Sequence, residues 1–214
     1  MDTEKNIKRF EELFSEIKRD GADKLLESIR KSDFYKAPAS TRFHLNEEGG
    51  LLQHSLNVYD CLVAIAETPL WKPYIGNVSK ETLTIVSLLH DLCKTYYYTI
   101  DYKNQKTYDA EKVAATSPRE VKHDIKGDFI WEVAPFYTVD NKYPVGHGSK
   151  SVILIQMCMK LTMEEIMAIN WHMGAYCDSS QWGELGEAFE KYPLALALHQ
   201  ADAMASALLE SKKG

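Results

Sequence analysis

The run from Ile85 to Lys94 reads Ile-Val-Ser-Leu-Leu-His-Asp-Leu-Cys-Lys, so that an apolar stretch leads directly into a histidine and an aspartate. Ser79, upstream of this run, is a suitable N-cap for a helix that carries its apolar residues. An aspartate in apolar surroundings costs on the order of several kcal/mol unless it is paired or bound to a metal ion. The run therefore predicts a buried helix that places polar side chains inside the fold.

Much of the remaining chain repeats apolar side chains at three- and four-residue steps, which is typical of amphipathic helices. Thr162-x-x-Glu165 is a capping box, and Gly49-Gly50 opens a further helix. Helices are predicted at residues 2–18, 22–32, 49–66, 79–92, 149–160, 162–172 and 192–211.

Between Thr95 and Pro144 the pattern is no longer helical. Three β-prone runs, Tyr96–Ile100, Phe129–Val133 and Phe136–Val139, lie among polar and turn residues and predict a small antiparallel β-hairpin or meander. The expected fold class is therefore all-α, a helical bundle with a β-hairpin insertion. The organisation predicted is a single domain over residues 1–214, with N-terminal helices and a loop at residues 1–48 and a β-containing insertion at residues 96–145.

The chain has 214 residues, of which 45% are apolar and 26% charged, as in ordinary globular proteins. Its 25 basic and 31 acidic residues give a net charge of −6, so no binding of duplex nucleic acid is expected. No apolar stretch reaches about 18 residues, and no membrane partner is expected. The four cysteines, Cys61, Cys93, Cys158 and Cys177, form no C-x-x-C pair, which favours a reducing compartment and a cytoplasmic location.

Six ionisable side chains lie where the pattern predicts an interior or a helix end: His54, His90, Asp91, His147, His172 and Asp202. Taken singly, such a histidine is more often a hydrogen-bonded core residue, and such an aspartate is more often a cap or an ion-pair partner. Together they offer imidazole nitrogens and carboxylate oxygens from separate helices, which is how helical bundles build sites for divalent ions. The set therefore predicts a metal centre.

Three segments carry a family resemblance: Gly49-Gly50-Leu51-Leu52-Gln53-His54, Leu88-Leu89-His90-Asp91-Leu92-Cys93-Lys94 and Leu198-His199-Gln200-Ala201-Asp202. In order and in flanking residues they resemble the motifs of the HD superfamily of metal-dependent phosphohydrolases. The resemblance covers roughly residues 40 to 210 and is weaker across the β insertion.

The resemblance implies a ligand set and an HD-type bundle. His54, His90, Asp91 and Asp202 would form the basic metal site. The other two histidines of the set, His147 and His172, fit the extra ligands of members that hold two ions, with Asp91 as the bridge. The expected cofactors are thus divalent metal ions, two rather than one, and Fe, Mn, Ni, Co, Zn and Mg are not distinguished by the sequence.

Other residues could act beside the metals, whose role would be to activate water and neutralise phosphoryl charge. Lys94 is expected on the same helix face as the histidine of the His-Asp pair, where it could reach a phosphate. Arg42 and Lys150 are further substrate-binding candidates, and a solvated surface role is equally open for each. His44 could act as acid or base, or simply bond to the backbone. The candidate catalytic residues are Asp91, Lys94 and His44.

The function expected is that of a phosphohydrolase acting on a nucleotide or another small phosphate ester through metal-activated water. The acidic charge and the small insertion favour a small phosphorylated substrate over a polymer. Three alternatives stay open at this point: a di-iron oxygenase of the same fold, a 3′–5′ nuclease, and a non-catalytic nucleotide-binding module. Lys94, in a His-Asp-x-x-Lys pattern, favours hydrolysis. The sequence predicts no oligomeric state.

Overall fold

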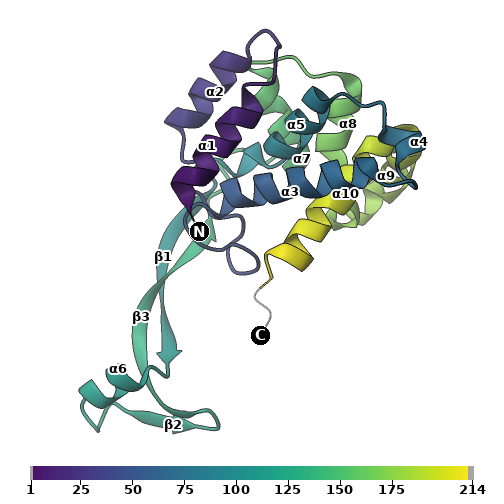
Figure 1. The fold of residues 1–214 in the computed structure, drawn as a ribbon. Coiled ribbons are helices and arrows are strands. Elements are labelled where there is room, and N and C mark those ends of the chain that lie inside the picture. The colour runs from purple at the N-terminus through teal and green to yellow at the C-terminus, as the bar shows by residue number, and fades with distance from the viewer. Residues whose placement is uncertain (1, 212–214) are drawn as a thin grey trace. The chain divides into compact units, whose positions relative to one another are not determined.

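The structure is a computed structural model, and it describes residues 2–211. The chain forms two compact units, one from the segments up to Tyr98 and from Asp140 onward, and one from Thr99–Val139 (Figure 1). None of the helices between residues 2 and 211 is both long and apolar enough to cross a membrane.

The first unit is a helical bundle. In chain order its helices are α1 (Thr3–Phe14), α2 (Ala22–Lys31), α3 (Gly50–Glu67), α4 (Lys72–Ile75), α5 (Lys80–Leu89), the 3₁₀ turn η1 (Leu92–Lys94), α7 (His147–Gln156), α8 (Met163–Trp171), the 3₁₀ turns η2 (Gly174–Tyr176) and η3 (Ser179–Gln181), α9 (Trp182–Lys191), α10 (Pro193–Met204) and the π-helical turn η4 (Ala205–Leu209).

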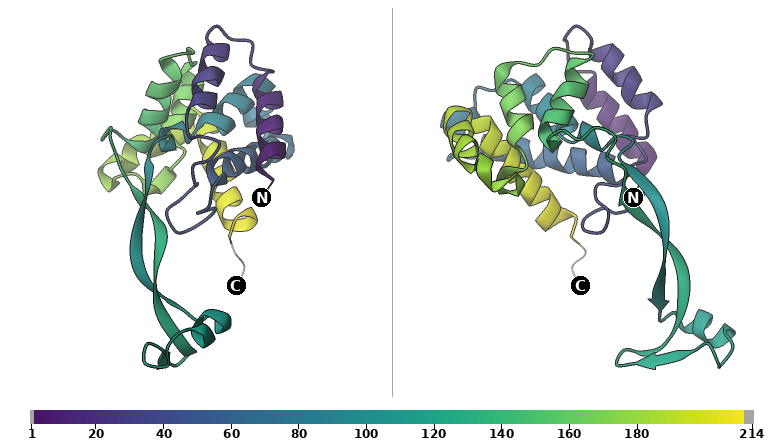
Figure 2. Two further views of the ribbon diagram at one scale, coloured as in Figure 1. Left: turned by 90° about the vertical axis from the view of Figure 1, so that its left-hand side faces the viewer. Right: turned by 180° about the vertical axis from the view of Figure 1, so that it is seen from behind.

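Helix α3 lies at the centre of this bundle, where it packs against α5 and α10, and α10 also packs against α8 (Figures 1 and 2). Twelve of the 18 residues of α3 are buried, so most sides of this helix face the interior rather than a single apolar stripe. The site described below is built on these packed helices, which hold side chains more rigidly than loops do.

Glycines allow two close approaches that position the site. A Cβ atom at Gly148 would clash with the carbonyl groups of Asn170 and Ile169, so glycine lets the start of α7 lie against the end of α8. A Cβ atom at Gly50 would likewise clash with the carbonyl oxygen of Leu45, which brings the loop before α3 onto the start of that helix.

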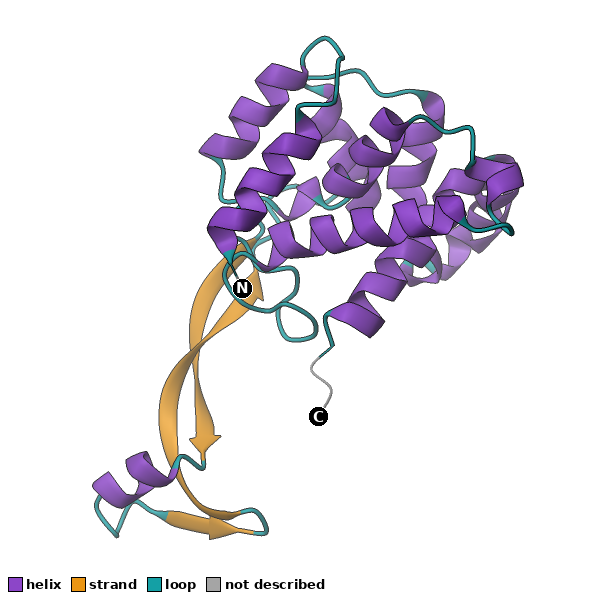
Figure 3. Cartoon of the chain, viewed as in Figure 1, coloured by secondary structure: helices purple, strands orange, loops and turns teal. Residues whose placement is uncertain are grey.

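The second unit is a small sheet with one short helix. It contains β1 (Tyr98–Thr107), α6 (Ala110–Ala115), β2 (Lys122–Asp124) and β3 (Gly127–Val139). The strand order is β1-β3-β2, and β2 pairs antiparallel with β3, with Lys122 opposite Phe129 and Asp124 opposite Gly127 (Figure 3). These strands lie inside the predicted insertion, residues 96–145.

A mostly helical bundle with a β insertion is confirmed, as are the N-cap at Ser79 and the capping box at Thr162. Three details of the prediction are wrong. The insertion contains a helix, α6, that was not predicted, and a short polar strand, β2, whose strand form comes from pairing with β3. Helix α9 was missed because Gly183 and Gly186 weaken its helical pattern. The last helix is not continuous to Ser211, since the π-helical turn η4 follows α10.

Candidate metal centre

The helical unit brings all six predicted ligand side chains together. They come from five places in the fold: His54 in α3, His90 and Asp91 at the end of α5, His147 at the start of α7, His172 at the end of α8 and Asp202 in α10. Every one except His147 and Asp202 is almost fully buried.

The carboxylate of Asp91 lies in the middle of this cluster. Its Oδ2 is 3.5 Å from Nε2 of His54 and 3.4 Å from Nε2 of His90. Its Oδ1 faces the other way, 2.6 Å from Nε2 of His147 and 3.5 Å from Nε2 of His172. One carboxylate thus faces two separate pairs of imidazole nitrogens.

Asp202 completes the group around the first pair. Its Oδ1 is 3.3 Å from Nε2 of His54, and Nε2 of His54 is in turn 3.3 Å from Nε2 of His90. Two ligands that each lie about 2.1 Å from one ion at a tetrahedral angle are about 3.4 Å apart. The spacing of these atoms therefore fits ligands of a common ion.

Backbone carbonyls fix the orientation of two of the rings. Nδ1 of His90 donates to the carbonyl of Ser87 at 2.8 Å, and Nδ1 of His172 donates to the carbonyl of Ile169 at 2.7 Å. Because Nδ1 carries the proton in both rings, Nε2 is left with its lone pair directed into the cluster. Nδ1 of His199 donates in turn to the carbonyl of His172 at 2.7 Å.

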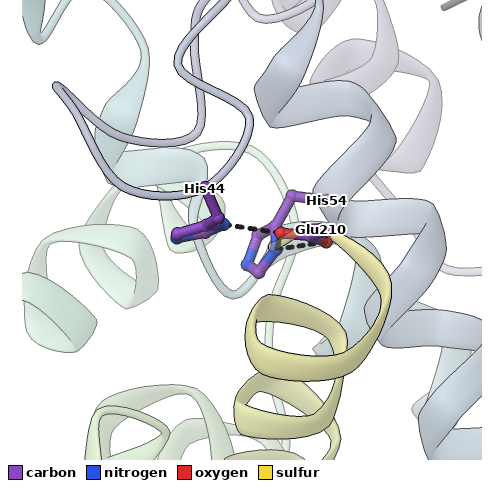
Figure 4. A group of neighbouring side chains, drawn as sticks. All are labelled: His44, His54 and Glu210. Atoms are coloured by element: carbon purple, nitrogen blue, oxygen red, sulfur yellow. Dashed lines mark hydrogen bonds and ion pairs between the residues drawn. The ribbon is translucent and has the colours of Figure 1, made fainter. Parts of the chain in front are cut away.

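Glu210 holds the third ring and was not among the predicted site residues (Figure 4). Its buried carboxylate accepts hydrogen bonds from Nδ1 of His54 at 3.0 Å, from Nδ1 of His44 at 2.5 Å and from the Asn57 amide at 2.9 Å. The π-helical turn η4 directly precedes Glu210. The signal in the sequence was a single acid after Leu208-Leu209, too weak to separate from a solvated helix end.

Hydrogen bonding outweighs burial at His54 and Glu210. Burial alone would lower the pKa of His54, but hydrogen bonds with Asp202 and Glu210 raise this pKa to about 10. Burial would raise the pKa of Glu210, whereas hydrogen bonds from His44 and His54 hold it at about 2. The negative charges around His54 therefore attract a cation. When no metal ion is bound, a proton on His54 supplies this positive charge.

His90, His147 and Asp91 have the protonation states that metal binding requires, whereas at His172 the interactions with Asp91 outweigh burial and raise the pKa. Burial lowers the pKa of His90 and of His147, which favours the neutral imidazole. Burial would raise the pKa of Asp91, but the charge of Lys94 and the hydrogen bond with His147 hold it well below its ordinary value, so the carboxylate is ionised.

The residues present fit a divalent ion. In the part of the chain that the structure describes, Nε2 of His172 is buried and has no hydrogen-bond partner. An orphaned buried nitrogen of this kind is costly in a structural core, and a metal ion is a natural partner for its lone pair. Nitrogen and carboxylate donors together suit Zn, Fe, Mn, Co or Ni, so the donor set leaves the choice of ion open.

Lys94 lies at the cluster, although not on the same helix as His90. Helix α5 ends at Leu89, and Lys94 lies in the 3₁₀ turn η1, where the chain tightens after the buried His-Asp pair. Its Nζ donates to Oδ2 of Asp91 at 2.7 Å and to the carbonyl of Ala39 at 2.7 Å. Burial would lower the pKa of Lys94, but Asp91 raises it overall, so the amine is charged.

The two other substrate-binding candidates have different surroundings. Arg42 is exposed, and its guanidinium lies 4.9 Å from the centre of the Phe43 ring. Lys150 is buried, and its Nζ is 3.1 Å from Oδ1 of Asn141. A substrate-binding role for either residue stays a prediction.

Cys93 was counted among the cysteines but not among the site residues. Its Sγ lies 3.4 Å from both ring nitrogens of His147, and with Asp91 these two residues form a group close enough to share an ion. Burial raises the pKa of the Cys93 thiol to about 12, so the neutral thiol packs against the histidine.

Fold and site together define a helical protein with a candidate metal centre in its bundle. No family model and no solved structure matches the chain. The chain is similar to the dihydroneopterin 2′,3′-cyclic phosphate phosphodiesterase of Methanocaldococcus jannaschii, with 34% identity over 74 residues. That match covers 35% of this chain and 28% of the archaeal protein, so it spans less than a third of the relative's length.

Proposed function

We propose that this protein is an HD-type, metal-dependent phosphohydrolase that acts on a nucleotide or another small phosphate ester. The observation that carries the proposal is the central position of Asp91, whose two oxygens face two different pairs of histidines. The partial relative named as a cyclic phosphate phosphodiesterase supports phosphoester cleavage as the class of reaction.

The proposed ligand sets follow from the same distances. His54, His90 and Asp202 would hold one ion with Oδ2 of Asp91, and His147 and His172 would hold a second with Oδ1 of Asp91, in line with the ligands named above. Such ions, when bound, activate water as a nucleophile and neutralise charge on a phosphoryl oxygen. The second ion would have three protein ligands, which leaves a position for substrate.

Lys94 is proposed to bind the phosphate. An ammonium group has three N–H donors, and Lys94 uses two of them for Asp91 and the carbonyl of Ala39. The third is available for a phosphoryl oxygen. Because the first two contacts fix the amine, little side-chain entropy is lost when it meets the substrate.

His44 is proposed as the group that protonates the leaving oxygen. Its Nδ1 is bonded to Glu210, which leaves Nε2 as the nitrogen free to carry a proton to substrate. Its side chain is 19% exposed, whereas His54 beside it is 1% exposed, so His44 is the more accessible of the two. The ring centres of His44 and His54 are 5.0 Å apart, which places this donor next to the proposed ligands.

The proposal is tested by stripping the protein of metal, reloading it separately with Mn, Fe, Co, Ni, Zn and Mg, and assaying hydrolysis. Substrates are bis(p-nitrophenyl) phosphate, 2′,3′-cyclic nucleotides and nucleoside monophosphates. We expect metal-dependent hydrolysis with at least one ion, and its loss in Asp91→Ala. Lys94→Met is expected to retain metal and lose about tenfold or more in turnover, the loss typical of a charge-assisted contact to substrate.

Two outcomes would overturn this function. Metal-loaded protein that hydrolyses none of these esters would contradict it. Iron-loaded protein that consumes oxygen without releasing phosphate or alcohol would instead identify the oxygenase alternative.

A further inference from the structure

A cavity of about 500 Å³ lies in the helical unit, in the size range of small-molecule sites. None of the six proposed metal ligands lines this cavity, so it is distinct from the candidate metal centre. The two lie near each other in the chain. Leu92 and Thr95 of the lining follow Asp91, and Lys150 follows His147 by one turn of α7.

The charged groups that line this cavity are all basic. They are Lys31, Lys142 and Lys150, in a chain whose net charge is −6. Lys31 pairs with Glu27 at 3.0 Å and Lys142 with Asp140 at 3.7 Å, both at the exposed surface. These two lysines are partly neutralised.

Lys150 differs from both. It is only 7% exposed, and within residues 2–211 no carboxylate lies within 4.0 Å of its Nζ. Its Nζ meets the amide oxygen of Asn141 at 3.1 Å and lies 4.9 Å and 5.7 Å from the ring centres of Tyr97 and Tyr143. A buried ammonium without a counter-ion is costly, and an anionic ligand in the adjoining cavity would supply one.

The rest of the lining suits a ligand with a flat apolar part. Leu25, Ile29, Leu92 and Leu154 form apolar walls, and exposed Tyr96 and Tyr143 offer ring faces for stacking. The hydroxyl oxygen of Thr95, also in the lining, is buried and has no hydrogen-bond partner among the described residues.

We infer that this pocket binds a small phosphorylated heteroaromatic molecule of the size of a nucleoside monophosphate. Lys150 meets the phosphate, Tyr96 and Tyr143 stack on the base, and Thr95 accepts or donates one hydrogen bond. The site is separate from the proposed metal centre and does not depend on the proposed hydrolysis.

Calorimetric titration of the metal-free protein, kept in EDTA, tests this inference with AMP, UMP, adenosine and inorganic phosphate as probes. We expect a nucleoside monophosphate to bind about tenfold or more tightly than adenosine, since a charge-assisted contact is lost with the phosphate. Lys150→Met, which keeps the apolar stem, should weaken binding by about tenfold or more. Lys160→Met, which removes an exposed lysine outside the lining, should leave binding unchanged.

Thermal unfolding shows whether each variant is folded. Leu154→Trp is a second variant in case Lys150→Met does not fold, because the larger side chain fills the cavity while Lys150 keeps its charge. Leu154→Trp should also abolish binding. Absence of binding of both monophosphates to the wild-type protein would overturn the inference. Binding that survives in both folded Lys150→Met and folded Leu154→Trp would also overturn the inference. So would binding that is lost in Asp91→Ala instead. Neither result would bear on the proposed metal-dependent hydrolysis.

Discussion

Two buried carboxylates in the helical unit, Asp91 and Glu165, have opposite surroundings. Glu165 accepts two hydrogen bonds from the Arg19 guanidinium at 2.5 and 2.6 Å, one from the Thr82 hydroxyl at 2.9 Å and one from the backbone of Thr162 at 2.8 Å. Every one of these partners is a donor, so the charge of Glu165 is matched within the protein.

Asp91 instead accepts a hydrogen bond from Lys94 and faces Nε2 atoms of four histidines. Nε2 of His54 and Nε2 of His90 are 3.3 Å apart, and Nε2 of His172 lacks a hydrogen-bond partner among residues 2–211. A buried polar network stabilises a fold only when all of its members are satisfied. The difference teaches that the Glu165 network is complete without a ligand, while the Asp91 network leaves one buried nitrogen, Nε2 of His172, without a partner among the described residues.

The largest effect should follow from Asp91→Ala. We expect retained metal to fall by about 100-fold or more and hydrolysis to disappear, since this change removes the carboxylate that faces both pairs of histidines. Metal analysis after dialysis measures the first effect and the ester assay the second. Full metal occupancy in this variant would show that Asp91 does not bridge.

Glu165→Ala should lower the free energy of unfolding by about 3 kcal/mol, because it leaves the Arg19 charge without its buried partner. The metal content per folded protein should stay the same in Glu165→Ala, whereas it should fall in Asp91→Ala. Chemical denaturation measures the change. The matched control is Glu187→Ala, whose exposed pair with Lys191 should change the free energy of unfolding far less. Equal effects of the two variants would contradict the comparison.

Glu210→Gln should weaken metal affinity by about tenfold, within the range found when a carboxylate behind a metal-bound histidine is lost. The substitution keeps the shape of the side chain but removes the charge that orients Nδ1 of His54. Competition with a chelator gives the affinity, and Glu187→Gln serves as the surface control. An unchanged affinity would assign Glu210 a purely structural role.

The smallest effects concern pH, and the two networks should respond at opposite ends of the scale. The pKa of Glu165 is lowered from 4.5, chiefly because the Arg19 hydrogen bonds outweigh burial, so its contribution to stability is present above pH 4.5 and is lost as the pH falls through the folded value. The pKa of His54 is raised from 6.5 to about 10, so in metal-free protein its contribution is present below pH 6.5 and is lost as the pH rises toward 10.

Denaturation of metal-free protein across this pH range measures both contributions. Glu165→Gln should flatten only the acid limb of the stability profile. Glu210→Gln should flatten the alkaline limb, because His54 loses its partner, and also the acid limb, because the pKa of Glu210 is itself lowered to about 2. An alkaline limb that changes in Glu165→Gln, or that stays unchanged in Glu210→Gln, would contradict these assignments.

Local signals explain why so much of the helical unit could be predicted. Ser79 and Thr162 cap helices through contacts with residues three positions away, and contacts over so short a spacing can be predicted from the sequence. The six proposed ligands could be named because ionisable side chains in apolar or glycine-flanked segments are conspicuous wherever they occur. Lys94 was expected at the site from its spacing after His90, but the end of α5 at Leu89 was not expected, since the tight turn after it depends on packing.

The sequence by itself determined the helical elements, the sheet-forming character of the insertion and the candidate ligands, because each follows from residue type and short-range spacing. Only the tertiary structure decided which atoms meet. Glu210 reaches His44 across 166 positions and His54 across 156, and Lys150 borders a cavity whose other walls come from α2 and the turn after Asp91. Contacts between distant segments depend on how the helices pack, and no local pattern encodes that packing.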